Sequence, residues 1–115
     1  MGDTPYAFIN DKSEELEKKA EMLVLVYDYR IAKFKRQIPH EIAEDGNAVV
    51  KNDFERILRN YRRRWSNKIA VKARKENIPQ ELIEQKIYDP QRIQRSEEDT
   101  IEMFENLREK GRIFL

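Results

Sequence analysis

Apolar residues between positions 12 and 37 recur at intervals of three and four, which is the spacing of one face of an α-helix. They are Leu16, Ala20, Leu23, Tyr27, Ile31 and Phe34. Asp11 precedes them as a candidate N-cap, with Glu14 three residues later as its capping-box partner. We therefore predict a helix over residues 12–37. Residues 1–10 lack this period and contain a glycine and a proline, so we expect an N-terminal arm there.

The same predicted helix carries a second apolar face. Its members are Met22, Leu25, Val26 and Tyr29, which lie opposite the first stripe at about 100° per residue. A helix that is apolar on two sides has to be covered on two sides. The second cover comes either from the chain's own bundle or from another subunit, and we treat these four residues as a candidate protein interface.

A second long helix is predicted over residues 48–76. Its apolar stripe consists of Phe54, Ile57, Leu58, Tyr61, Trp65 and Ile69. Before it, residues 38–47 contain a proline and an Asp-Gly-Asn turn signal, and form the predicted connector. The residue before a proline avoids helical backbone angles, so Ile78-Pro79 marks the break after this helix.

Two shorter helices complete the predicted fold. Pro79 is well placed to start one over 79–88, and Ser96, with an acidic residue three positions later, resembles a capping box for another over 97–110. No segment alternates apolar and polar residues with period two, so we expect no sheet. The prediction is one all-α domain over 1–115: a bundle of about four helices, the two long ones antiparallel.

Composition narrows the classes of function. Charged and hydrophobic residues each make up 39% of the chain, which suits helices with narrow buried stripes. The sequence has no cysteine, which excludes disulfides, thiolate metal sites and cysteine nucleophiles. No apolar stretch approaches the roughly 20 residues that span a bilayer, and the N-terminus lacks the pattern of a signal peptide. We expect a cytoplasmic protein without membrane contact.

The residues with chemical potential do not form a catalytic or metal-binding pattern. His40 is the single histidine, and glutamates alone accompany it, which makes a poor metal site. The three glycines are isolated, so there is no phosphate-binding loop. No nucleophile–base arrangement can be proposed. We expect no metal, no cofactor and no small-molecule substrate, and we do not expect an enzyme.

Basic residues are concentrated in the second long helix. From Arg56 to Lys75 there are nine basic residues and no acidic one, although the whole chain has a net charge of +1. Four of them project away from the apolar stripe and are the candidate binding residues, namely Arg56, Arg59, Arg63 and Arg74. The planar guanidinium group of arginine suits bidentate hydrogen bonds to phosphate or carboxylate.

Three interpretations of this basic face remain open. It is a solvated face with salt bridges to the acidic runs at 14–21 and 97–105, a surface for an acidic protein partner, or a surface for nucleic acid. The near-zero net charge favours the first. No aromatic residue lies among the outward arginines to stack on a base, which argues against the binding of single strands.

The second long helix also contains a spacing found in a known family. The residues that carry it are Leu58, Tyr61, Arg63, Lys68 and Ile69, with Arg56-Ile57 just ahead of them. This pattern resembles the helical subunits of GINS, the replication complex that accompanies the replicative helicase. Ser96-Glu97-Glu98 resembles the start of the family's next helix, with Phe104 and Leu107 inward. The resemblance covers about residues 55–110. It departs from the family at Trp65 and Ser66, where an arginine and a leucine are expected.

The resemblance implies a helical domain that assembles with sister subunits through long helices, and that acts as a scaffold without chemistry of its own. The small β-domain that accompanies it in the family has no counterpart in these residues. Our leading hypothesis is a non-enzymatic assembly subunit of the DNA replication machinery, with protein partners or self-association. The alternative is a small helical nucleic-acid-binding protein of viral or plasmid type that uses the basic face.

Overall fold

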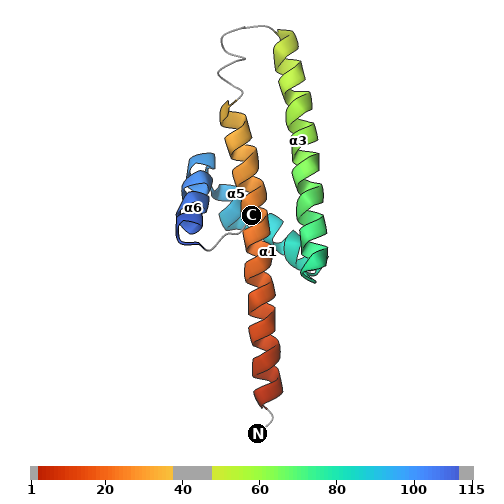
Figure 1. The fold of residues 1–115 in the computed structure, drawn as a ribbon, viewed down its shortest axis with the longest axis vertical. Helices are drawn as coiled ribbons and strands as arrows, with labels where there is room; N and C mark the ends of the chain where they lie inside the picture. Colours follow the sequence, from red (N-terminus) through yellow and green to blue (C-terminus); the bar gives the residue numbers. More distant parts are fainter. Residues whose placement is uncertain (1–2, 38–47, 112–115) are drawn as a thin grey trace.

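A computed structural model describes the backbone of residues 3–37 and 48–111 and the side chains of residues 13–37 and 53–111. The helices are α1 (Asp3–Gln37), α3 (Ala48–Lys75), α4 (Gln80–Ile87), α5 (Pro90–Gln94) and α6 (Glu97–Glu109). No strand occurs in the described ranges, so the predicted all-α fold is confirmed. The two long helices, α1 and α3, run antiparallel, as expected (Figure 1). The predicted connector at 38–47 lies outside the described residues.

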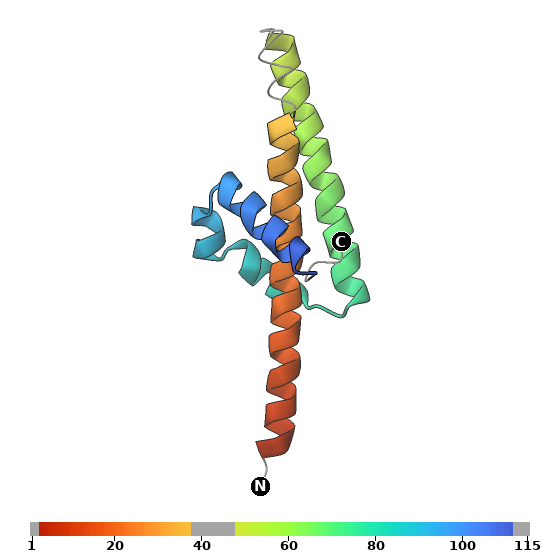
Figure 2. The ribbon, with the colours of Figure 1, turned by 60° about the vertical axis from the view of Figure 1, so that its left-hand side comes forward.

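The predicted N-terminal arm is wrong for most of its length, because α1 begins at Asp3. Pro5 does not prevent this. It stands in the first turn, where backbone N–H groups have no partner within the helix, so a residue without an N–H is tolerated. At 1.5 Å per residue, the 35 residues of α1 span about 52 Å. The N-terminal third of α1 extends beyond the ends of the other helices (Figures 1 and 2).

α1 is the central helix, and its first apolar face packs against α3 and α4. Buried Leu23 and Val24 of α1 meet Ile69 of α3 and Ile83 of α4 in one core cluster. Leu23 belongs to the stripe that the spacing of three and four predicts, whereas Val24 was not part of that stripe. Only part of the α3 stripe is buried with it, however. Ile57 remains 44% exposed, whereas Leu58 beside it is 8% exposed.

The second apolar face of α1 is covered by α6 of the same chain, which lies across α1 in Figure 2. Leu25 is 3% exposed and Val26 is 1% exposed. Tyr29 stacks on Phe104 of α6, with 3.7 Å between the ring centroids, and Met22 packs against the same cluster. The expectation that these α1 residues form an interface with another protein is therefore wrong. The alternative, that α1 is the centre of its own bundle, is what the structure shows.

Local capping interactions mark the end of α3 and the starts of α5 and α6. Asn77 takes up the left-handed backbone conformation (φ 59°) after α3, and Ile78 N–H donates to the Ala73 carbonyl, 2.8 Å away. The Ser96 hydroxyl accepts a hydrogen bond from Asp99 N–H at 3.1 Å, which confirms the predicted cap of α6. α5 was not predicted. Asp89 caps it, accepting from Gln91 N–H at 3.0 Å, and no apolar period marks its five residues.

Candidate nucleic-acid interface

The four candidate arginines of the second long helix lie on the exposed side of α3. We call this set the outer basic face, and its members are Arg56, Arg59, Arg63 and Arg74. All four are exposed, because α1 is the helix against which α3 packs and it covers the opposite side. Arg56 and Arg74 are 18 positions apart, which corresponds to about 27 Å along the helix axis. The face is thus a basic strip, with its members grouped on one side of a straight helix.

The acidic runs of the chain do not neutralise the outer basic face. Arg56 forms an exposed ion pair with Asp53, one turn earlier, at 3.3 Å. Within the ranges that the structure describes, Arg59, Arg63 and Arg74 form no ion pair. A face held by salt bridges to the acidic runs is therefore not the observed arrangement.

The glutamates of those runs that form ion pairs do so with lysines of α1 and α4. Glu97 pairs with Lys35, and Glu105 pairs with Lys33 at 3.7 Å, both across the α1–α6 contact. Glu17 of α1 accepts a hydrogen bond from Lys86 of α4 at 2.9 Å. These pairs join α4 and α6 to α1. The excess positive charge of α3 is left facing solvent.

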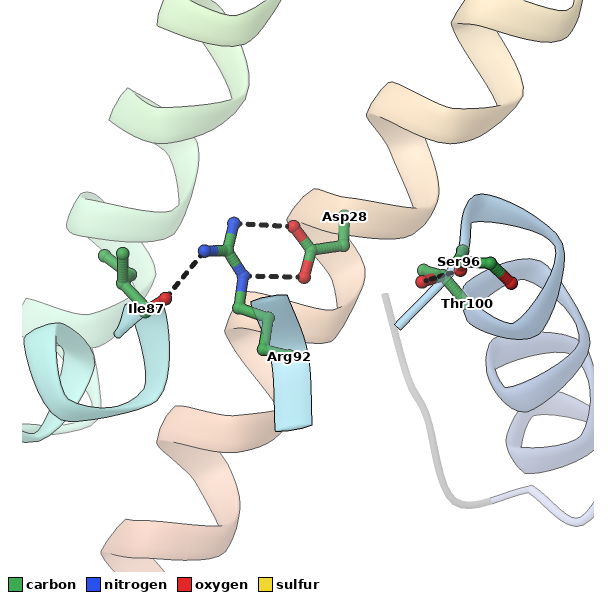
Figure 3. Close-up of polar contacts among 5 residues, drawn as sticks. All are labelled: Asp28, Ile87, Arg92, Ser96 and Thr100. Atoms are coloured by element: carbon green, nitrogen blue, oxygen red, sulfur yellow. Dashed lines mark hydrogen bonds and ion pairs between the residues drawn. The ribbon is translucent and has the colours of Figure 1, made fainter. Parts of the chain in front are cut away.

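A hollow of about 420 Å³ lies between α1, α3 and the α5–α6 segment, and an ion pair forms part of its wall. The Arg92 guanidinium donates two hydrogen bonds to the Asp28 carboxylate, at 2.9 and 2.8 Å, and a third to the Ile87 carbonyl at 2.7 Å (Figure 3). The hydrogen bond to Asp28 raises the pKa of Arg92 above its usual value, while partial burial opposes this. Because Asp28 and Ile87 occupy these donors, Arg92 fastens α4 and α5 to α1.

The same hollow is bordered by the first turn of α6. The Thr100 hydroxyl donates to the Ser96 carbonyl at 2.9 Å, which keeps that buried hydroxyl satisfied (Figure 3). Sequence reasoning did not identify Arg92 or Asp28, which are 64 residues apart. No local pattern marks such a pair, because it exists only once α5 has packed on α1.

The described side chains form ion pairs, helix caps and an exposed basic strip. Among them, no group of three histidine, cysteine, aspartate or glutamate residues is placed to hold a metal ion. None of the helices in the described ranges has a stretch long and apolar enough to cross a membrane. The surface feature that stands out is the strip of arginines on the exposed face of α3.

Comparisons with known proteins add no family assignment. No protein-family model, curated protein or solved structure matches the chain. The resemblance to the helical subunits of GINS therefore stays a hypothesis based on the residues quoted above.

Proposed function

We propose that this chain is a non-enzymatic helical protein that binds nucleic acid through the outer basic face of α3. The observation that carries the proposal is the separation of charge within the bundle. α3 holds ten basic and two acidic residues, and the acidic runs elsewhere pair with lysines of α1 and α4. An exposed helix with this excess of positive charge attracts a polyanion.

The backbone of a duplex fits this face better than a single strand does. Duplex DNA presents about one negative charge per 1.7 Å of its axis, so several phosphates lie within reach of a strip about 27 Å long. Arginine can bond each phosphate through two N–H groups. Single-strand sites use exposed aromatic rings as stacking platforms. Tyr61 and Trp65 are half-buried towards α1 instead of standing among the outward arginines.

An assembly subunit is the second candidate function. Ile57 and Val71 are 44% and 47% exposed and lie 14 residues apart on α3, near the outer basic face. Apolar side chains contribute little to a phosphate contact, whereas an acidic amphipathic helix would cover them. This arrangement is consistent with the resemblance to GINS, in which long helices contact sister subunits. The second apolar face of α1 does not support this function, because α6 covers it.

Salt-dependent binding tests the leading proposal. If each of the four arginines neutralises one phosphate, the logarithm of the affinity for a 30-base-pair duplex should fall with log salt with a slope of about −3.6. Between 50 and 200 mM salt this is a loss of about 150-fold. Fluorescence anisotropy of labelled duplex and single-stranded DNA and RNA gives the affinities.

A charge-matched control separates the face from net charge. The triple variant Arg56→Glu, Arg59→Glu, Arg63→Glu should abolish binding. Lys18→Glu, Arg36→Glu, Lys110→Glu makes the same change in charge at exposed positions of α1 and beside α6, and should retain most of it. Equal losses in both variants, or no retention of the native chain at low salt, would refute the proposal. Light scattering across concentrations tests assembly: a strictly monomeric mass with no recovered partner removes that alternative.

A further inference from the structure

We propose that the junction of α1, α3 and α6 forms a discrete site for a phosphoryl group, separate from the outer basic face. The site consists of four cations that we call the cation cluster: Arg30 and Lys33 of α1, Lys68 of α3 and Arg108 of α6. None of the four belongs to the outer basic face. They come together only in the folded chain.

Two aromatic rings hold the cation cluster together. The Arg30 guanidinium carbon lies 5.1 Å from the centroid of the Trp65 ring, and Lys68 Nζ lies 4.6 Å from the same ring. Around Tyr29, the guanidinium carbons of Arg30 and Arg108 lie 5.7 and 5.6 Å from the ring centroid. Lys33 Nζ lies 6.0 Å from that centroid. Attraction between a cation and the face of an aromatic ring fixes each group at the junction.

The cluster has more positive charge than its surroundings neutralise. Lys33 pairs with Glu105 at 3.7 Å. Within the described part of the chain, Arg30, Lys68 and Arg108 have no ion pair. The Nε–H group of Arg30 is buried and has no hydrogen-bond partner there. A buried donor without a partner costs free energy, and gathered like charges repel each other, so an anion that accepts from these groups would stabilise the junction.

A phosphoryl group has the chemistry that this arrangement recognises. It carries up to two negative charges and several acceptor oxygens, which suits donors that arrive from three helices. Arg108 is oriented at the edge of the site, since its guanidinium donates to the Tyr29 hydroxyl at 3.2 Å. The group comes either from free phosphate or from a phosphorylated end of a nucleic acid. A phosphoryl group from either source would accept hydrogen bonds from the same donors of the cation cluster.

Trp65 is the single tryptophan of the chain and stands within the site, so its fluorescence reports occupancy. The native chain is titrated with inorganic phosphate at constant ionic strength, with chloride as the balancing salt. We expect a saturable change in Trp65 emission. The double variant Arg30→Gln, Lys68→Gln should weaken phosphate binding at least about tenfold, because each substitution removes a charge-assisted hydrogen bond to the anion.

Calorimetry with the same probe checks the result, since the double variant changes the surroundings of the reporter itself. Arg108→Gln, on the exposed side of α6, provides a second test that leaves Trp65 and the α1–α3 contact untouched. Arg59→Gln, Arg63→Gln is the matched control on the outer basic face and should leave phosphate affinity unchanged. A native chain that binds phosphate but no nucleic acid would therefore count against the proposed function and not against this site.

A pair of oligonucleotides with and without a 5′-phosphate identifies the source of the group. Tighter binding of the phosphorylated strand, lost in Arg108→Gln, assigns a nucleic-acid end. Saturation by inorganic phosphate with no preference between the strands assigns a free anion. No saturable response to any of these probes, or an equal loss in the outer-face control, overturns the proposal.

Discussion

Replacement of Phe104 by alanine tests whether α6 covers α1 in solution. Phe104 is 0% exposed, its ring stacks on Tyr29 at 3.7 Å and 10°, and it belongs to the core cluster that includes Leu25 and Val26. Truncation of a buried phenylalanine costs about 3–5 kcal/mol, from lost burial and from the cavity left behind. The lost aromatic pair places the expected cost in the upper part of that range.

We expect a loss of about 4 kcal/mol in the free energy of unfolding, measured by urea denaturation followed by circular dichroism. For a chain of 115 residues, this corresponds to a fall in Tm of about 15 °C. Ile93→Ala is the matched control: Ile93 is 66% exposed on neighbouring α5, so its truncation should stay within about 0.5 kcal/mol. A Phe104→Ala variant as stable as Ile93→Ala would show that α6 does not pack on α1.

Four further outcomes are expected. Leu25→Glu should lower both Tm and helix content, because the residue is 3% exposed; a fully folded variant that merely loses self-association would restore the interface interpretation. Asp28→Asn should destabilise the chain by about 2 kcal/mol, because Arg92 loses a charged acceptor in a partly buried pair; no change in the urea midpoint would contradict this. Ser96→Ala should lower the free energy of unfolding by about 1 kcal/mol, because the N-cap of α6 is lost. Ser66→Ala, at a serine within α3 that caps no helix, is the control. The hydrogen bond to Glu17 raises the pKa of Lys86 above its ordinary value of 10.5. The ion pair therefore stabilises the fold fully below pH 10.5, and this contribution is lost as the pH rises through the pKa of Lys86 in the folded chain. The Lys86→Met variant should lose less stability between pH 9 and 12 than the native chain.

The helices could be predicted because their signals are local. The period of apolar residues gives α1 and α3, and Ser96 gives the start of α6. Where prediction failed, the apolar period was missing. A helix of five residues, such as α5, is too short to show a period. The start of α1 was misjudged because proline was taken as a barrier in a turn that tolerates it.

Contacts between segments that are distant in the chain could not be predicted from the sequence. The apolar pattern of α1 showed that its second face had to be covered, but α6 and another subunit satisfy that requirement equally well. Phe104 supplied the cover, and nothing in the spacing of the chain favours that choice over a partner. The ion pair between Asp28 and Arg92 and the cation cluster depend on the same docking of helices, so charge patterns along the sequence could not reveal them.

The small net charge of the chain is a poor guide to its partners, because the pairing of charges depends on which helices meet. Near neutrality suggested that the acidic runs would satisfy the arginines of α3. The fold instead packs α4 and α6 on α1, and these contacts join Glu97 to Lys35 and Glu17 to Lys86. Because these acidic residues pair with lysines, they do not neutralise α3, which carries ten basic residues and two acidic ones. A chain that is almost neutral as a whole therefore presents a strongly basic helix, and the proposed binding depends on the charge of that helix rather than on the net charge of the chain.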